Sequence, residues 1–284
     1  MYYYYCELYG HIIDIIEQKK VSRLLIIKKK YKPYADFIVI FHSMNNQSVV
    51  FGKIVEQRRS VRKFSDDVVP DDVVRRSLDR ALLSPNSSNL QLWEFYRVKS
   101  SDNLKKLAHY CLDQNAATSA QEMVVVVVRK DKWKKHADYV LQQSRALFPA
   151  QPGKREKLVE QYYSKVIPSL YFADPLDLWG KGKKVAANVV GMFRPMIREV
   201  SAEDMRVVVH KSAALAAQTF MLSISAEGYD TCPMEGFDSV KVKQLLQLPS
   251  QAEINMVISI GKGKEDGIYG PRLRVDSQSV VFER

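Results

Sequence analysis

Apolar residues recur along the chain at spacings that predict its helices and strands. Residues 71–82 and 207–227 repeat apolar positions every three to four residues, which is typical of helices that bury one face. Residues 93–98 and 254–260 are short apolar runs typical of strands. Residues 123–128 are almost pure valine, the composition of a strand covered on both faces. The pattern therefore predicts helices packed on a sheet with a buried central strand.

Helix ends are marked by residues that favour caps and turns. Ser48 and Ser239 are of a type that caps helix N-termini, and Gly228 suits the left-handed turn that ends a helix. Pro70 opens the helix that follows it, with acids in the first turn. We expect this helix to turn four apolar side chains inward: Val74, Leu78, Ala81 and Leu82.

Two segments lack a sustained period. Residues 1–43 contain a tyrosine run and a lysine triplet but no coherent core pattern. We interpret them as a dispensable extension of a domain formed by residues 44–284, with translation from upstream of a true start at Met44 as one explanation; a membrane-contacting arm is the alternative. Residues 151–200 predict an irregular insertion punctuated by Pro and Gly, whose aromatic residues pack on the domain.

The chain is basic, with a formal net charge of +11. Residues 130–200 alone hold 14 Lys and Arg against 7 Asp and Glu. Such an excess raises nucleic acid as a partner, but no nucleic-acid motif accompanies it. A basic surface near an enzyme mouth can equally gather anionic substrates. We therefore expect no nucleic-acid partner.

Cysteine content and hydropathy indicate the cellular compartment of the protein. Cys6, Cys111 and Cys232 are odd in number and scattered, which favours free thiols in a reducing compartment and a cytoplasmic location. They offer no spacing that would grip a metal. No apolar run approaches the roughly 18 residues of a membrane helix, so we expect a soluble protein without a membrane partner.

Candidate chemistry concentrates in four motifs. Residues 57–64 read Gln-Arg-Arg-Ser-Val-Arg-Lys-Phe, and residues 84–93 read Ser-Pro-Asn-Ser-Ser-Asn-Leu-Gln-Leu-Trp. Residues 231–238 read Thr-Cys-Pro-Met-Glu-Gly-Phe-Asp, and residues 271–274 read Pro-Arg-Leu-Arg. Guanidinium forks and a serine hydroxyl in the first motif suit a phosphate, because their donors match its oxygens. Taken alone, the cluster would more often be a solvated basic helix end.

Together, in this order, the four motifs resemble the FMN-dependent nitroreductase family over about residues 48–284. Its second motif has Ser and Pro where this chain has Asn86 and Leu92. The resemblance implies an α+β three-layer sandwich, with a mainly antiparallel sheet flanked by helices, assembled as a homodimer with two FMN sites at the interface. It also implies FMN as cofactor and NAD(P)H as co-substrate, with hydride passing through flavin N5 to a quinone, nitroaromatic or similar acceptor by a ping-pong mechanism.

The sequence leaves other functions open. The family also contains reductive dehalogenases and a flavin-fragmenting branch, and the charge alone would suit a flavin- or nucleic-acid-binding module without turnover. The chain lacks an evident catalytic triad or metal set, which fits chemistry carried by a bound cofactor.

The resemblance also assigns cofactor contacts. Residues of the first and fourth motifs would bind the FMN phosphate, and Arg62 would lie at the pyrimidine side of the flavin ring. The second motif would bind the ribityl chain and ring edges, and the third would line the N5 side through its backbone. The full set of expected cofactor-binding residues is Arg58, Arg59, Ser60, Arg62, Ser87, Asn89, Gln91, Asn115, Pro233, Glu235, Gly236, Arg272 and Arg274.

Overall fold

The computed structural model describes residues 46–174 and 176–284, and the chain divides into two units, residues 1–56 and 57–284. The prediction for residues 1–43 lies outside the described residues. Residues 46–57 are helical, so Ser48 lies inside a helix and not at its N-cap. The second unit carries the sheet and all four motifs.

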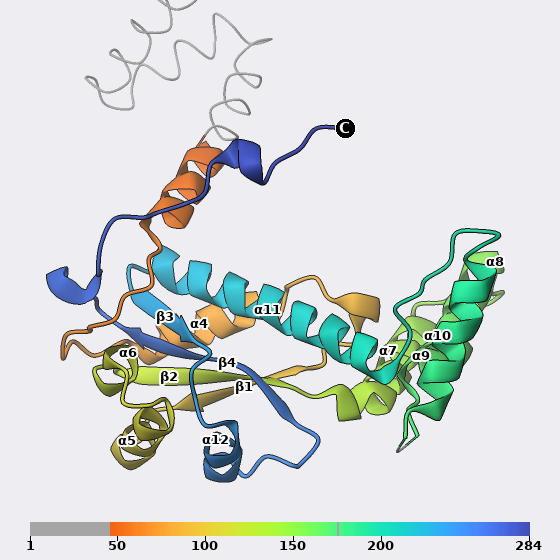
Figure 1. Cartoon of the computed structure of the whole chain (residues 1–284), viewed down its shortest axis with the longest axis horizontal. Helices are drawn as coiled ribbons and strands as arrows, with labels where there is room; N and C mark the ends of the chain where they lie inside the picture. Colours follow the sequence, from red (N-terminus) through yellow and green to blue (C-terminus); the bar gives the residue numbers. More distant parts are fainter. Residues whose placement is uncertain (1–45, 175) are drawn as a thin grey trace, which may run out of the picture. The chain divides into compact units, whose positions relative to one another are not determined.

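A four-stranded sheet forms the centre of residues 57–284 (Figure 1). Its strands are β1 (Trp93–Val98), β2 (Glu122–Val128), β3 (Asp230–Met234) and β4 (Glu253–Gly261). They lie in the order β1-β2-β4-β3, and each neighbouring pair is antiparallel. The predictions of β1, β2 and β4 are confirmed, whereas the hydropathy pattern did not predict β3.

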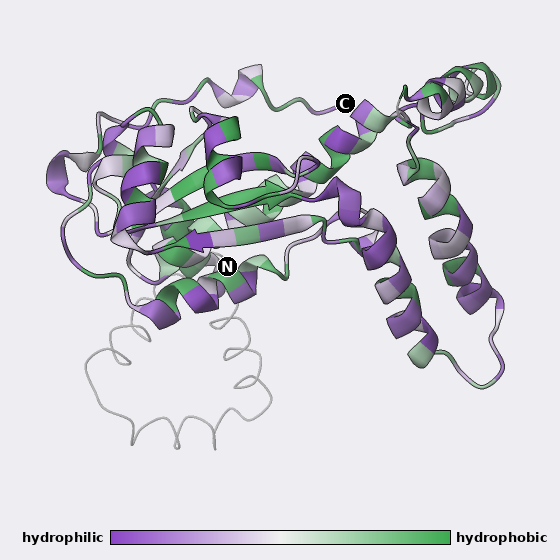
Figure 2. Cartoon of the chain, turned by 90° about the horizontal axis from the view of Figure 1, so that it is seen from below, coloured by the Kyte–Doolittle hydropathy of each residue, from purple (hydrophilic) through white to green (hydrophobic). Residues whose placement is uncertain are grey.

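β2 is buried on both faces, as its composition predicts. Val124, Val126 and Val128 point into one apolar core, and Met123, Val125 and Val127 point into the other. The first core is covered by α4 (Asp71–Ala81) and α11 (Ala202–Ala226). The second is covered by α5 (Ser101–Tyr110), α6 (Asn115–Thr118) and α12 (Ser239–Leu245). The three-layer α+β fold is therefore confirmed, and Figure 2 shows the apolar sheet between its helices.

α11 is the longest helix described in the second unit and spans the sheet. It begins five residues earlier than its apolar pattern predicts, because Ser201 and Asp204 form a capping box: the Asp204 amide donates to Ser201 Oγ. Gly228 ends it with φ of +82°, as predicted. Among the described helices, α11 alone has the length and apolarity to cross a membrane, yet its Phe220 and Ile224 are fully buried against the sheet, as in a core helix.

The prediction of an irregular insertion at residues 151–200 is wrong. After η3 (Lys130–Lys132) and α7 (Trp133–Ala146), the chain forms α8 (Lys154–Gln161), a π-helical turn η4 (Tyr162–Val166), α9 (Ile167–Tyr171) and α10 (Leu178–Val190). Pro168 lies in the first turn of α9, where no amide donor is needed. Gly180 lies against Asp177, whose Oδ1 would be 2.0 Å from an added Cβ. These residues shape the helices and do not interrupt them.

Two smaller predictions also fail. Asp238, not Ser239, caps α12, since its Oδ1 accepts hydrogen bonds from the amides of Val240 and Lys241 at 3.0 Å. Leu82 follows α4 and is exposed. Residues 280–282 have the apolar composition of a short edge strand, but they follow the 3-10 turn η6 (Ser277–Ser279) and are exposed without strand pairing in the part of the chain that the structure describes.

Glu227 provides a pH-dependent link between α4 and the end of α11. Arg76 and Arg80 bind its carboxylate at 2.9 and 2.7 Å, and Arg80 also donates to Ser223. These hydrogen bonds lower the pKa of Glu227 to about 2, Arg76 contributing most. An unfolded glutamate titrates near a pKa of about 4.3. The stabilisation is therefore complete above that pH and disappears as pH falls toward 2.

We expect Glu227→Gln to lower the free energy of unfolding by about 1 kcal/mol at pH 7, the range of partly exposed ion pairs. The difference from the parent should shrink as pH falls below about 4. Urea denaturation across pH 7 to pH 3 measures both, with Glu283→Gln in the exposed C-terminal tail as control. A difference that stays constant with pH would contradict this assignment.

Candidate functional site

Residues 58–64 are held in extended form beside the outer edge of β3. Ser60 pairs with Thr231 in a parallel bridge, and the Val61 amide donates to the Thr231 carbonyl at 3.1 Å. The Arg62 amide donates to Gly267 O at 2.8 Å. Val61 is buried, whereas Arg62 is exposed. The backbone pairing thus directs the charged side chain away from the core.

Two glycines of the 261–267 segment allow this close approach. An added Cβ on Gly261 would lie 2.7 Å from the Phe64 side chain, and one on Gly267 would lie 2.7 Å from the Lys63 carbonyl oxygen. The fully buried Phe64 ring therefore packs directly on the Gly261 backbone. The glycine-rich sequence after β4 therefore has a packing role.

The first and fourth motifs meet in one cavity of about 400 Å³, which we call the arginine cavity. Arg272 Nη2 donates to the Arg58 carbonyl at 2.6 Å, and Arg59 Nη2 donates to Gly270 O at 2.7 Å. Residues more than 200 positions apart are thereby tied together. The lining residues are Arg58, Arg59, Ser60, Arg62, Ile268, Tyr269, Gly270, Pro271, Arg272, Leu273 and Arg274.

The arginine cavity concentrates positive charge. Burial lowers the pKa of Arg58 below its ordinary value, and repulsion from Arg272 and Arg274 lowers it further. Within the described residues, Arg58, Arg62 and Arg274 form no ion pair. An anion that accepts hydrogen bonds from these groups would relieve their mutual repulsion. A phosphate ester such as that of FMN fits this donor set.

Tyr269 joins a further predicted residue to the cavity. The Arg62 guanidinium lies over the Tyr269 ring, 5.1 Å from its centroid, and Asn115 Nδ2 donates to the Tyr269 hydroxyl at 2.7 Å. Asn115 is thus linked to the cavity through an aromatic residue that the motif analysis missed. Tyr269 lies two residues before the Pro271-Arg272 motif, and this proximity is the feature of the sequence that could have identified it.

The third motif starts in β3 and continues beyond it. Cys232 is buried beside the cavity: burial raises the pKa of its thiol, while the positive charges of Arg62 and Arg58 oppose that rise. Pro233 lies within β3, on an edge strand where a missing amide donor is tolerated. Glu235 and Gly236 are exposed just after the strand, and Gln114 Nε2 donates to Gly236 O at 2.7 Å.

The second motif lies elsewhere. Its turn η2 (Ser87–Asn89) is held near the middle of α11, where the Ser87 amide donates to Ser212 Oγ at 3.2 Å. The Asn89 and Gln91 backbones have positive φ, and Gln91 Nε2 donates to Asn89 O at 3.1 Å. From Ser212 to the end of α11 is about 21 Å of helix, and β3 begins only after that end. One chain therefore does not bring Ser87, Asn89 and Gln91 to the arginine cavity.

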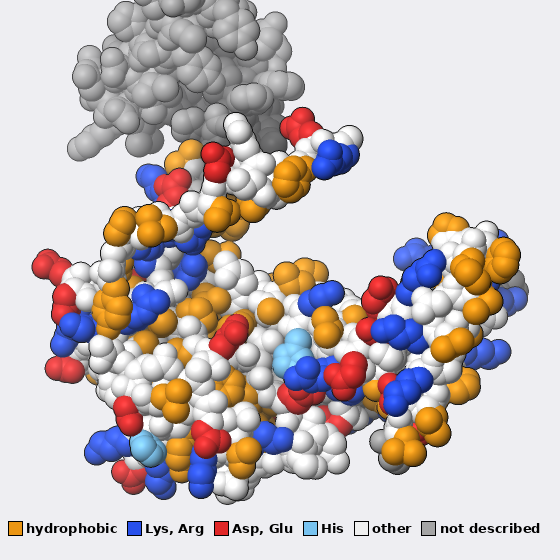
Figure 3. Space-filling model, in the orientation of Figure 1, with side chains coloured by type: hydrophobic (Ala, Val, Ile, Leu, Met, Phe, Trp, Pro, Cys, Tyr) orange, Lys and Arg blue, Asp and Glu red, His pale blue; other side chains and the backbone are white. Residues whose placement is uncertain are grey.

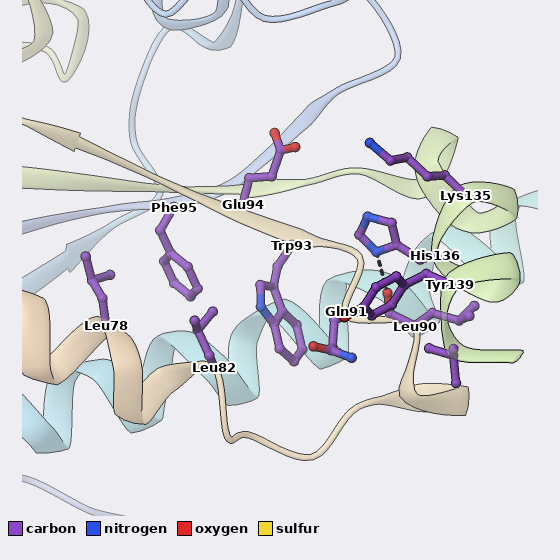
Figure 4. A pocket seen from close by; sticks show the side chains of 11 residues that line it. Leu78, Leu82, Leu90, Gln91, Trp93, Glu94, Phe95, Lys135, His136 and Tyr139 are labelled. Atoms are coloured by element: carbon purple, nitrogen blue, oxygen red, sulfur yellow. Dashed lines mark hydrogen bonds between the residues drawn. The ribbon is translucent and has the colours of Figure 1, made fainter. Parts of the chain in front are cut away.

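A second cavity, of about 580 Å³, lies behind this loop, and we call it the β1–α7 cavity (Figure 4). Gln91 lines it together with residues of α4, β1 and α7. His136 Nδ1 donates to the Leu90 carbonyl at 2.7 Å, so this histidine has a partner that the sequence did not indicate. Among the described residues, no group of three His, Cys, Asp or Glu side chains is placed to hold a metal ion.

The three-layer fold and the arginine cavity define an α+β protein with a cluster of arginines built onto the edge strand of its sheet. The chain belongs to the Nitroreductase family, whose profile matches residues 55–262. This match covers most of the second unit and includes the first three motifs. It confirms the resemblance identified in the sequence.

Individual relatives agree with the family assignment. The chain is 25% identical over 230 residues to YdgI of Bacillus subtilis, which is named as an NAD(P)H nitroreductase; the match covers 80% of this chain and 95% of that protein. Its fold is similar to the solved structure of ydfN from Bacillus subtilis, with a TM-score of 0.65, 23% identity, and coverage of 84% and 100% of the two chains. A protein of Exiguobacterium sibiricum solved in complex with FMN has a TM-score of 0.56 at 20% identity, covering 82% and 97%.

Burial predicts inert thiols at this site. It raises the pKa of Cys111 to about 12 and also raises that of Cys232, so neither side chain is a thiolate at neutral pH. We expect iodoacetamide to leave both unmodified in the folded protein at pH 7.5 and to modify both in guanidinium chloride. Peptide mass spectrometry measures each site separately. Modification of Cys232 at equal rates in the two conditions would contradict its burial.

Proposed function

We propose that this protein is an FMN-dependent oxidoreductase that transfers reducing equivalents from NAD(P)H to a quinone, nitroaromatic or similar electron-poor acceptor. The observation that carries the proposal is the arginine cavity on a nitroreductase fold, since its clustered guanidinium groups suit the FMN phosphate. Bound FMN supplies the hydride chemistry that amino-acid side chains lack. The NAD(P)H nitroreductase name of YdgI and the FMN complex of the Exiguobacterium protein support the choice of donor and cofactor.

The chain's own residues bind and orient in this proposal. Arg58, Ser60 and Arg274 donate hydrogen bonds to the phosphate, assisted by Arg59 and Arg272. The last two also hold the cavity wall, because each donates to a backbone carbonyl across it.

Other residues face the cofactor ring. Arg62, held over Tyr269, places positive charge at the pyrimidine side. Asn115 acts through the Tyr269 hydroxyl. Pro233, Glu235 and Gly236 flank the ring through the backbone at the end of β3, where Gln114 fixes the Gly236 carbonyl. These residues position the ring and exclude water from its reactive edge.

We further propose that the complete site requires two copies of the chain. Ser87, Asn89 and Gln91 are held far from the arginine cavity of their own chain, so a partner's loop would supply these contacts. α10 supports a partner, since its residues Leu178, Val185 and Val189 form an exposed apolar stripe. Figure 3 shows apolar and basic side chains side by side along this part of the surface.

Arg58→Ala should release the cofactor. A charge-assisted hydrogen bond to phosphate contributes about 1.5 to 3 kcal/mol, so the FMN dissociation constant should rise at least tenfold. Arg274→Ala should behave alike. Flavin fluorescence titration measures both, and Arg75→Ala on the exposed face of α4 is the control. Parental affinity in both variants would remove these arginines from the site.

Arg62→Leu should change the redox potential of the bound flavin more than it changes the affinity for FMN. A cation beside the pyrimidine side favours the reduced flavin, which gains negative charge near N1, so its loss should lower the midpoint potential. Dye-equilibration titration of the flavin-loaded variant measures this. If the variant loses flavin but the potential of the remaining bound flavin is unchanged, Arg62 binds the phosphate. If only the thermal stability falls, Arg62 has a structural role.

The flavin-loaded protein should sediment as a dimer. Asn89→Ala should weaken FMN binding without changing the sedimentation coefficient, because it removes a contact made across the interface and leaves the interface intact. Analytical ultracentrifugation at 450 nm detects only flavin-loaded species. A flavin-loaded monomer would overturn the two-chain site.

A further inference from the structure

The turn of the second motif has a backbone that needs support from outside. Ser88, Asn89 and Gln91 all have positive φ, between 49° and 55°, where the Cβ of an L-residue is strained. Glycine adopts this region freely, but residues 84–93 contain none. Such a conformation persists only where the surrounding structure holds it. The contacts of the turn therefore decide whether it presents its polar side chains in a fixed geometry.

Two tyrosines supply this support at Ser88. The Tyr163 hydroxyl donates to the Ser88 carbonyl at 2.9 Å. The Tyr162 hydroxyl lies 2.8 Å from Ser88 Oγ, within hydrogen-bond distance. These tyrosines are 74 and 75 positions further along the chain. Ser88 is not among the expected cofactor contacts, so the tyrosines hold the turn without competing for the ligand.

The two tyrosines begin the π-helical turn η4, a rare form that occurs frequently at functional sites. Neighbouring side chains on an α-helix point about 100° apart and do not face each other. A π-helical turn is wider and changes this angle. The rings of Tyr162 and Tyr163 meet edge to face with their centroids 5.3 Å apart, and both hydroxyls reach Ser88.

The helix that continues from η4 is anchored in the core. Ile167 is fully buried, and the buried Tyr171 ring stacks on Trp133 with the centroids 6.1 Å apart. Burial raises the pKa of Tyr163, so its hydroxyl stays protonated and remains a hydrogen-bond donor at neutral pH. The tyrosines therefore project from a fixed base toward a strained turn.

We propose that Tyr162 and Tyr163 are positioning residues of the cofactor site. They hold Ser88 so that the turn presents Asn89 and Gln91 to the flavin bound by the other chain of the dimer. This inference rests on the two-chain site proposed above. It gives the helices of residues 151–200 a task in cofactor binding that the expected contact set does not include. The tyrosines of one chain set the FMN affinity of the arginine cavity in the other.

Phenylalanine substitutions remove each hydroxyl and keep the ring. Each lost hydrogen bond should raise the FMN dissociation constant about fivefold, and Tyr162→Phe/Tyr163→Phe should raise it about twentyfold. Flavin fluorescence titration measures the affinity, and circular dichroism melting checks that each variant is folded. Tyr139→Phe is the matched control, because Tyr139 is 61% exposed on α7 and forms no hydrogen bond within the described residues.

A mixed dimer tests whether the effect crosses the interface. One chain carries Arg58→Ala, the other carries Tyr162→Phe/Tyr163→Phe, and two different affinity tags allow the mixed dimer to be purified. If the tyrosines act on the other chain's cavity, one site combines both defects and the second site has neither. We therefore expect one FMN per dimer bound at parental affinity, whereas neither homodimeric variant has such a site.

The possible failures are distinguishable. A parent protein that binds no FMN would overturn the proposed function and this inference together. If the parent binds FMN and Tyr162→Phe/Tyr163→Phe binds it with equal affinity, this inference alone is wrong. Two weak sites in the mixed dimer would also contradict it, because the tyrosines would then act within their own chain or through its general stability.

Discussion

Six consecutive side chains of β2, residues 123–128, are withdrawn from water, three toward each face of the sheet. Burying each such side chain stabilises the fold by roughly 1.5 kcal/mol or more, and this requires helices on both faces. α11 covers one face and α5 with α12 covers the other. Within the sheet, β2 lies between β1 and β4, and β3 is left at the edge. That edge is where residues 58–64 attach.

The position of the arginine cavity depends on this edge of the sheet. Ser60 pairs with Thr231, so its position is set by the register of β3 on β4. A slip of one residue would turn each side chain to the opposite face of the sheet. Phe64 on Gly261 fixes the other end of the segment, because the contact leaves no room for a side chain. Packing in the core therefore determines where the guanidinium groups stand.

Elements with a clear period were predictable from sequence. Burial of apolar surface is the dominant contribution to the formation of three elements: the valine strand β2, the aromatic strand β1 and the apolar helix α11. β3 was not predictable, since its five residues include Pro233 and an acid and it is specified by pairing with β4. α9 and α10 were missed because Pro168, Gly180 and Gly182 read as breaks, whereas tertiary packing accommodates them.

The site was predictable in part. Motif order identified the arginines that line one cavity, but sequence spacing carries no information on distance, so the separation of Ser87, Asn89 and Gln91 from that cavity had to come from the fold. Tyr269 was missed because a lone aromatic residue in a polar tail has no periodic signal. The β1–α7 cavity arises from four separate elements and leaves no trace in any one of them.

The hydrogen bonds of Arg59 to Gly270 and of Arg272 to Arg58 close a loop of more than 200 residues. During synthesis the chain emerges from its N-terminus, so α4, β1, β2 and α11 are available well before residues 270–274 leave the ribosome. The arginine cavity is therefore among the last features to form. A ligand held by this cavity would bind only after residues 270–274 have been translated, so it could not guide the earlier assembly of the sheet.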